Sequence, residues 1–365
     1  MASKSDDAQT DEDSGKAALF SMSLTDGFTE WLAGTGSSLA FTTYQAGKVF
    51  LIGSNKSEGR LSVFERSFPR CMGFGVSPED GSRTLWLSSL YQLWRFENFL
   101  LPGQIKEGYD AVFVPVEGRT TGEVDVHDIH PRDNEPPVFV VTRFNCLATL
   151  DAQNSFKPIW TPPFITDIVP EDRCHLNGLS MRDGKPGFVT CVAASNTRRG
   201  WHDKRRDGGL VIDVETNETI VEGLSMPHSP RLYRDELYII QTGTGEFGRV
   251  DRKSGQFEPM CFLPGFARGV AFIDNHAIIG VSRPRKDKTF EGLELNERLE
   301  AQNLDATCMI AVVNLKTGAI DHAFTIEGVV QELYDVAVLK SVNRGQLIGF
   351  QKPEIRFMVK PAPFA

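Results

Sequence analysis

The sequence predicts an all-β protein that folds as a six-bladed β-propeller. A short pattern, in which a polar residue precedes an apolar run, a turn and a second apolar run, occurs six times along the chain. The copies recur at intervals of roughly 40 to 65 residues and are followed by further strand-like runs, which is typical of propellers with four-stranded blades. The chain of 365 residues is long for one ordinary domain but suits six blades in one closed ring.

The six copies are expected to form the inner strands of the blades. Their middle residues are Met72, His127, Asn177, Pro230, Arg268 and Tyr334. The residues two positions earlier are Arg70, Asp125, His175, His228, Phe266 and Glu332. Side chains two positions apart on a strand face the same side, so both sets are expected to line the central channel. The residues between them are mostly small or apolar and are expected to face the blades: Cys71, Val126, Leu176, Ser229, Ala267 and Leu333.

The amino-terminal residues divide into a tail and the start of the propeller. Residues 1–18 are polar and acidic and show no hydrophobic periodicity. Such a segment cannot bury enough apolar surface to offset the entropy of ordering, so we expect a disordered tail. Residues 19–365 are expected to form a single propeller domain, which opens with a short helix over residues 28–32.

The ring is expected to close with strands from both ends of the chain. Residues 38–44, 48–53 and 60–64 read as three strands that precede the first inner-strand copy. They lack an inner strand of their own, whereas the last copy, around Tyr334, lacks outer strands. We therefore expect the amino-terminal strands to complete the last blade, which removes exposed sheet edges.

Two stretches interrupt the regular spacing of strands. Residues 283–307 are long and charged, and we interpret them as an insertion within a blade. Residues 198–206 contain the clustered arginines and lysine of an otherwise acidic chain. A solvated loop between strands is the simpler interpretation of this cluster.

Composition excludes several classes of protein. A net charge of −9 argues against a nucleic-acid partner, because phosphate binding depends on clustered Lys and Arg. No apolar run approaches the ~20 residues of a membrane span, and the amino terminus lacks the apolar core of a signal peptide. The six cysteines are scattered without a C-x-x-C pair, which excludes a zinc ribbon. We therefore expect a soluble, cytoplasmic protein with no membrane partner.

Several longer motifs resemble those of a known protein family. They are Thr142-Arg143-Phe144-Asn145-Cys146-Leu147, Asp172-Arg173-Cys174-His175-Leu176-Asn177-Gly178, Met226-Pro227-His228-Ser229-Pro230-Arg231 and Gly243-Thr244-Gly245-Glu246. The resemblance is to a conserved, mostly bacterial family of hypothetical proteins that carry a domain of unknown function, and it covers about residues 37–350. It implies no particular chemistry. More distantly, Asn177-Gly178 resembles the Asn-Gly element of gluconolactonase and regucalcin type propellers, in which such an Asn helps to bind a divalent metal.

Four channel residues form a candidate metal site. His175, His228, Glu332 and Asp125 lie on four different predicted blades and provide two imidazoles and two carboxylates. Zinc, iron(II) and manganese favour this donor set, and calcium is a further candidate for the carboxylates. The alternative is that the polar ring only solvates the channel.

Arginines near the same channel suggest an anionic guest. Arg231 and Arg268 carry fixed positive charge with forked donors that match a carboxylate or phosphate, and Arg143 is a third candidate. Asn177 and Tyr334 are expected to join them in binding substrate. The alternative for the arginines is structural, with Asp128, Asp335 or Glu332 as partners that hold adjacent blades together.

Two functions from different classes fit these features. The first is an enzyme of hydrolase, lyase or isomerase type that acts on a small carboxylate-bearing molecule at the channel, with a divalent metal and with His127 or His175 as general base. The second is a non-catalytic propeller that binds a protein or a glycan through loops such as residues 160–164 and 198–206. A propeller fold hosts both, so the fold alone does not decide between them.

Overall fold

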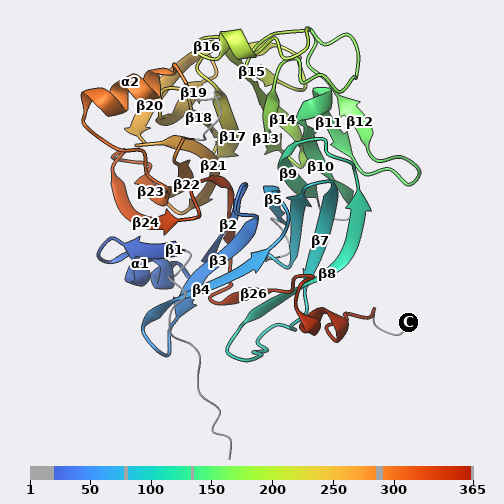
Figure 1. Ribbon diagram of the computed structural model, residues 1–365, viewed down its shortest axis with the longest axis vertical. Helices are drawn as coiled ribbons and strands as arrows, with labels where there is room; N and C mark the ends of the chain where they lie inside the picture. The colour runs from blue at the N-terminus through green and yellow to red at the C-terminus, as the bar shows by residue number, and fades with distance from the viewer. Residues whose placement is uncertain (1–19, 78–80, 133–134, 285–290, 363–365) are drawn as a thin grey trace, which may run out of the picture.

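The computed structural model describes residues 20–77, 81–132, 135–284 and 291–362, and the predicted tail at residues 1–18 lies outside them. Six sheets surround a common centre, each presenting one strand to it (Figure 1). This arrangement confirms the predicted six-bladed propeller. The blades are numbered here in the chain order of their inner strands.

Blades 1 to 3 follow one another along the first part of the chain. Blade 1 comprises β5 (Cys71–Val76), β6 (Thr84–Ser89), β7 (Gln92–Asn98) and β8 (Ala111–Thr120), with β26 (Gly345–Leu347) added in parallel to β8. Blade 2 comprises β9 (Val126–Arg132), β10 (Glu135–Val141), β11 (Cys146–Thr149) and β12 (Lys157–Trp160). Blade 3 comprises β13 (Leu176–Arg182), β14 (Lys185–Cys191), β15 (Gly209–Asp213) and β16 (Thr219–Leu224).

Blades 4 to 6 complete the ring. Blade 4 comprises β17 (Pro227–Tyr233), β18 (Glu236–Gln241), β19 (Glu246–Asp251) and β20 (Gln256–Phe262). Blade 5 comprises β21 (Phe266–Ile273), β22 (His276–Ser282), β23 (Met309–Asn314) and β24 (Ile320–Gly328), with β1 (Phe20–Leu24) paired to β24. Blade 6 comprises β25 (Leu333–Leu339), β2 (Ser38–Thr43), β3 (Lys48–Asn55) and β4 (Arg60–Ser67).

The predicted closure of the ring is confirmed in blade 6. Strand β2 pairs with β25 in antiparallel register from Ser38 opposite Leu339 to Thr43 opposite Leu333. The predicted short helix is also present as α1 (Phe28–Thr35), and its Phe28 is fully buried against blades 5 and 6. Strand β1 was not predicted.

The predicted insertion contains a second helix, α2 (Glu294–Ala301), which buries Leu295 and Leu299 beside the loop that follows β14. Part of the insertion lies outside the described residues. Helices α1 and α2 have eight residues each, and no helix in the described part of the chain could cross a lipid bilayer.

The inner strands match the predicted register in five blades but not in blade 4. In blade 4, His228 and not Pro230 occupies the position that His127 has in blade 2. Both histidines show this by the same contacts, since Nδ1 of each lies against a threonine hydroxyl and the carbonyl two residues earlier. The expectation that Ser229 faces the blades is therefore wrong, and Ser229 lines the channel. The other five blade-facing residues are buried in apolar clusters between blades, as expected: Cys71, Val126, Leu176, Ala267 and Leu333.

Every inner strand carries an irregularity at the same height in the channel. Within all six blades, the pairing of the inner strand with its neighbour shifts register at this point. A bulge of this kind bends the strand and re-aims side chains. Consecutive residues such as His127 and Asp128 therefore both line the channel.

The bulges surround a constriction where glycine and polar residues alternate. Blades 1, 3 and 5 contribute Gly73, Gly178 and Gly269, and blades 2, 4 and 6 contribute Asp128, Ser229 and Asp335. Each polar side chain accepts a backbone N–H from the blade that follows it in the ring, at distances of 2.9 to 3.1 Å. The blades approach so closely that a Cβ on Gly269 would lie 2.8 Å from the Asp335 backbone.

Candidate functional site

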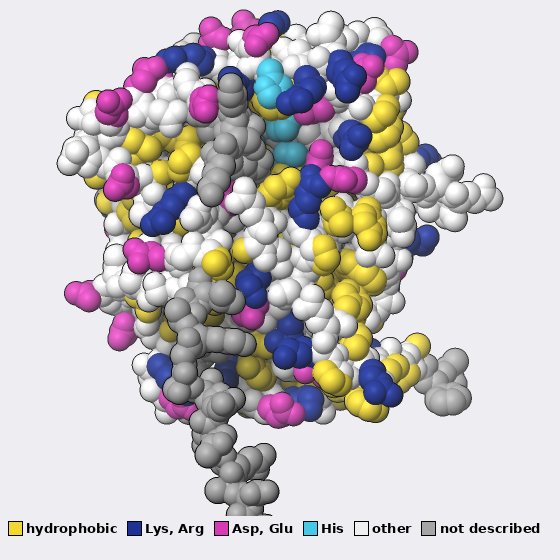
Figure 2. Space-filling view, in the orientation of Figure 1, with side chains coloured by type: hydrophobic (Ala, Val, Ile, Leu, Met, Phe, Trp, Pro, Cys, Tyr) yellow, Lys and Arg dark blue, Asp and Glu magenta, His cyan; other side chains and the backbone are white. Residues whose placement is uncertain are grey.

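A pocket of about 160 Å³ opens above the constriction. Both predicted sets of channel residues contribute to it, together with a loop from blade 3. Histidine side chains with Lys or Arg side chains beside them are visible on the face shown in Figure 2. The pocket is lined by Tyr44, Arg70, Met72, Asp125, His127, His175, Arg199, Trp201, His202, Met226, His228, Arg268 and Tyr334.

The backbone and Thr142 fix the tautomer of His127. The Thr142 hydroxyl donates to the Leu176 carbonyl at 2.6 Å, so its oxygen accepts from His127 Nδ1 at 2.7 Å. The Asp125 carbonyl, 3.1 Å from Nδ1, also can only accept. Nδ1 therefore carries the proton, and the neutral ring presents a lone pair on Nε2.

Burial lowers the pKa of His127 well below its usual value, and repulsion from His175, His228 and Arg268 lowers it further. The ring is consequently neutral at physiological pH, with an unprotonated Nε2. His228 has the same arrangement in blade 4, where Thr242 donates to the Ala267 carbonyl and accepts from Nδ1.

His175 has a different partner from His127. Its Nδ1 lies 3.0 Å from the carboxylate of Asp172, which also accepts the indole N–H of Trp201 at 3.0 Å. Trp201 stacks on the His175 ring with centroids 4.2 Å apart. An imidazole oriented by a carboxylate can carry the positive charge that develops during proton transfer.

The loop that contains the basic cluster closes one side of the pocket. Trp201 is 4% exposed, and Arg199 and His202 line the pocket beside it. Arg199 Nη2 donates to His202 Nε2 at 2.7 Å. The cluster lies in a loop between β14 and β15, as expected, and Arg199 is exposed, but the loop also contributes to the wall of the pocket.

Cations and aromatic rings form the opposite side. Arg268 is 5% exposed, pairs with Glu332 at 3.4 Å and lies over the Tyr334 ring at 4.9 Å. Tyr334 stacks on Tyr44, and Arg70 lies over the Tyr44 ring while pairing with Asp125 and Glu123. Three arginines thus face one small pocket in which the carboxylate of Asp125 is already paired.

The four predicted metal ligands do not form one coordination site. Asp125 pairs with Arg70, His175 with Asp172, and Glu332 with Arg268 behind the pocket wall. His228 stands at the height of His127 and not of His175. Within residues 20–77, 81–132, 135–284 and 291–362, no group of three or more His, Cys, Asp and Glu side chains could hold a metal ion. The donor set thus does not fit the expected divalent metal.

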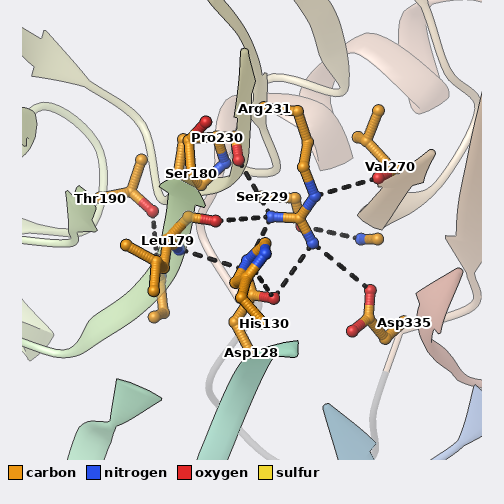
Figure 3. A network of polar contacts seen from close by, with 12 residues as sticks. Asp128, His130, Leu179, Ser180, Thr190, Ser229, Pro230, Arg231, Val270 and Asp335 are labelled. Carbon is orange, nitrogen blue, oxygen red and sulfur yellow. Dashed lines mark hydrogen bonds and ion pairs between the residues drawn. The ribbon is translucent and has the colours of Figure 1, made fainter. Parts of the chain in front are cut away.

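Arg231 does not line the pocket but holds adjacent blades together, which is the structural alternative given above for the arginines. It lies below the constriction, where Figure 3 shows it between Asp128 and Asp335. Its Nη1 and Nη2 bind the two oxygens of Asp128 at 2.7 and 3.1 Å, and Nε and Nη1 also donate to backbone carbonyls. Asp335 lies 3.7 Å away, and His130 contacts Asp128 at 3.1 Å. We call Asp128, Arg231 and Asp335 the channel brace.

The charges of the channel brace shift the two carboxyl groups in opposite directions. Burial favours protonation of Asp128, but attraction to Arg231 and His130 outweighs it and keeps the pKa of Asp128 below its usual range. For Asp335, burial and repulsion from Asp128 raise the pKa to about 7, against the attraction of Arg231. Nε, Nη1 and Nη2 of Arg231 are all engaged by Asp128 or by backbone carbonyls, which makes Arg231 unsuitable as a substrate ligand.

Two further predicted binding residues lie away from the pocket. Arg143 is exposed and donates to the Glu123 carbonyl, so it does not line the pocket. Asn177 lines a separate small cavity beneath the pocket. His127, His175, Arg268 and Tyr334 are brought together as expected.

The sequence pattern gives Asp172 and Tyr44 no role, and it places Arg199 and Trp201 only in the loop of residues 198–206 that was a candidate for binding a protein or a glycan. The Asp172-x-x-His175 spacing was a usable signal for the first of them, because a carboxylate three residues before a histidine can reach its ring within one turn. Trp201, Tyr44 and Arg199 enter the pocket from loops, whose paths the strand pattern does not predict.

Solved structures resemble this fold at low sequence identity. A chain from the crystal structure of a nidogen/laminin complex aligns with a TM-score of 0.53 and 9% identity, over 84% of this chain and 99% of that chain. A protein of unknown function from Bacteroides caccae gives 0.48 and 9% over 83% and 98%, and a streptogramin B lyase gives 0.39 and 12% over 67% and 72%. At these identities the likeness concerns the fold alone.

The family of the chain follows from a longer match. No curated protein matches the sequence. Residues 26–348, which include all six inner strands and every residue of the pocket, match the family described as a domain of unknown function (DUF4915). The resemblance to a family of hypothetical proteins is thereby confirmed, and the protein belongs to the DUF4915 family.

Proposed function

We propose that the pocket binds a small carboxylate-bearing molecule and catalyses proton transfer to and from it, as an enzyme of lyase, isomerase or hydrolase type. The observation that carries the proposal is the contact between His127 and His175, whose rings meet edge to face with centroids 5.0 Å apart. One ring has only a hydroxyl and a carbonyl at Nδ1, and the other has a carboxylate. Two imidazoles in such different environments suit the roles of base and acid.

Charge favours an anionic substrate. Arg268, Arg70 and Arg199 line the pocket, and guanidinium groups bind carboxylates with paired hydrogen bonds. Arg268 comes from the inner strand itself and is the most buried of the three, so we assign it the substrate carboxylate. A volume of about 160 Å³ limits the substrate to a small molecule.

The histidines then take distinct steps. His127, held neutral with its lone pair on Nε2, removes a proton from the bound molecule or from water. His175, supported by Asp172 at Nδ1, delivers a proton from Nε2 to the developing negative charge. Because the expected metal ligands do not converge, the chemistry is assigned to these side chains alone.

Binding is tested with small mono- and dicarboxylic acids by thermal shift and calorimetry. The informative variant is the double substitution Arg268→Gln with Glu332→Gln, which removes both charges of the pair and avoids leaving a buried carboxylate alone. Arg143→Gln is the matched control, because Arg143 is an exposed arginine of blade 2 that does not line the pocket. Loss of carboxylate binding in the double variant only is expected; equal binding in all three proteins would refute the anion site.

Catalysis is tested on hydroxy, unsaturated and lactone forms of the acids that bind, with products followed by NMR. His127→Gln and His175→Gln should each lower turnover by about 10² or more while leaving carboxylate binding intact. Binding without turnover in the wild-type protein would instead support the non-catalytic alternative, a propeller that only captures the anion.

A further inference from the structure

A small cavity adjoins the pocket on the side of the constriction. Its volume is about 10 Å³, and it is lined by His127, Asp128, Asn177, His228, Ser229, Arg268, Tyr334 and Asp335. Four of these residues, His127, His228, Arg268 and Tyr334, also line the pocket above. They therefore form the partition between the cavity and the substrate pocket.

The cavity has the size and polarity of a site for one water molecule. A cavity needs roughly 10 to 15 Å³ to hold a water, and a bound water needs two to four polar partners. All eight lining residues carry polar side-chain atoms. Cavities that stay empty have apolar linings, whereas a polar lining of this kind favours a bound water.

Asn177 provides the independent observation. Its side chain is 4% exposed, its Oδ1 accepts from Thr190 at 2.7 Å, and its Nδ2 has no hydrogen-bond partner within the described residues. If the amide were rotated so that Oδ1 and Nδ2 changed places, Oδ1 would be left without a hydrogen-bond donor instead. An amide group buried without a partner loses its hydrogen bonds to water and gains none in return, so a partner inside the cavity is expected.

His127 is the neighbour best able to share this partner. It occupies the equivalent position on the adjacent blade, and Thr142 joins the two strands by bonding both His127 and the carbonyl of Leu176. Since Nδ1 carries the proton, Nε2 is the acceptor. A water that accepts from Asn177 Nδ2 can donate to His127 Nε2 and satisfy both groups.

We infer that Asn177 and His127 hold a water molecule that is the second reactant of the enzyme. The inference rests on the proposed function and narrows it to reactions that add water to a double bond of the substrate, or that eliminate water in reverse. His127 Nε2 takes one proton from the water, and the water oxygen forms a bond to the attacked carbon. The electron pair of the double bond moves to its other atom, which takes a proton from His175. Atoms and electrons balance without an oxidant.

Asn177 is thus a positioning residue, and two variants test it. Asn177→Leu replaces the amide with an apolar group of similar shape, whereas Thr190→Val removes the other hydrogen bond of the same amide and keeps Nδ2. High-resolution crystal structures of the wild type and of Thr190→Val should contain a water within hydrogen-bond distance of Asn177 and His127. The Asn177→Leu structure should lack it.

The role in catalysis is tested with any acid that the wild type converts. Turnover in H₂¹⁸O should place ¹⁸O in the hydroxy acid, either when it is formed by hydration or when it is recovered after reversible dehydration. Asn177→Leu should lower kcat by about 10-fold or more with KM changed less than about threefold. Absence of the water in the wild type, its retention in Asn177→Leu, or a hydroxy acid free of ¹⁸O would overturn the inference. Turnover that depends on His127 but incorporates no solvent oxygen leaves the proposed function standing, whereas turnover that is independent of His127 refutes the proposed function itself.

Discussion

Arg231 of blade 4 binds both carboxylate oxygens of Asp128 of blade 2 across the channel, passing over blade 3. The same guanidinium donates to the carbonyl of Leu179 in the blade between them. Its Nε donates to the carbonyl of Val270 in blade 5, so one side chain ties four blades together below the pocket (Figure 3).

Removing Asp128 should therefore destabilise the protein strongly. Asp128→Asn leaves the buried guanidinium of Arg231 without its main counter-ion, and breaking a buried pair in this way costs about 3–5 kcal/mol. Glu258→Gln is the control, because its pair with Arg249 is exposed and is worth about 1 kcal/mol or less. Urea denaturation measures both, and comparable losses in the two variants would show that the brace adds no special stability.

Asp335 should make stability depend on pH. Its pKa is raised to about 7 in the folded protein, so the neutral carboxyl is favoured by the fold. Its contribution is complete below the unfolded value of about 4 and is lost as the pH rises through about 7. Asp335→Asn removes the titrating carboxyl group. The difference in unfolding free energy between wild type and variant should therefore change by on the order of 1 kcal/mol per pH unit between about pH 4 and 7.

The matched control for Asp335 is Asp235→Asn, which changes a carboxylate that is 88% exposed. Its stability should follow that of the wild type in parallel across the same pH range. Parallel curves for Asp335→Asn as well would mean that Asp335 stays ionised in the brace.

His127 should remain neutral and Nδ1-protonated in mildly acidic solution. Burial holds its pKa well below the usual value, so its contribution to stability is complete above about pH 6.5 and decreases as the pH falls. Nitrogen-15 NMR should find one protonated and one bare ring nitrogen at about pH 5.5, with His127→Gln identifying the signals. An imidazolium signal at that pH would show that burial does not hold the pKa of His127 well below its usual value.

Glycine 269 should tolerate no side chain. Gly269 has φ 75°, and an added Cβ would lie 2.8 Å from the backbone of Asp335, so Gly269→Ala combines strain with a clash. We expect a loss of about 2–4 kcal/mol. Gly122 has nearly the same φ of 76° but open space around it, so Gly122→Ala should cost only about 1 kcal/mol. Thermal unfolding compares them, and equal losses would remove the argument for close packing at the constriction.

The sequence contains enough information for the blades and their closure but not for the register of every inner strand. Spacing and apolar runs predict the blades because each inner strand must bury one face against its neighbours. Blade 4 was misaligned because the strand pattern assumes strict alternation, whereas a bulge between His228 and Arg231 adds a residue. The same bulges bring Asp128, Ser229 and Asp335 into the channel, which alternation excludes.

The candidate site was predictable where it depends on inner strands and not where it depends on loops. His127, Arg268 and Tyr334 reach the pocket from strand positions that repeat. Trp201 reaches it from a loop between β14 and β15, whose path depends on its own contacts, such as the indole bond to Asp172. Arg231 and Arg268 both occur within inner-strand copies, so the sequence does not distinguish their roles. Their contacts in the structure do, because Arg231 pairs with Asp128 below the constriction and Arg268 lines the pocket.

The pairing of β2 with β25 has a consequence for how the chain reaches its native state during synthesis. The backbone N–H of Asp335 donates to the hydroxyl of Thr42, 293 positions earlier in the chain. Until the ribosome has released the residues around Asp335, strands β2 to β4 have no inner strand and the edge of β2 stays unpaired. Forming contacts of such long separation is slow, and an unpaired edge is prone to join another chain. The closing blade is therefore completed last, and until then the edge of β2 is open to pairing with another chain.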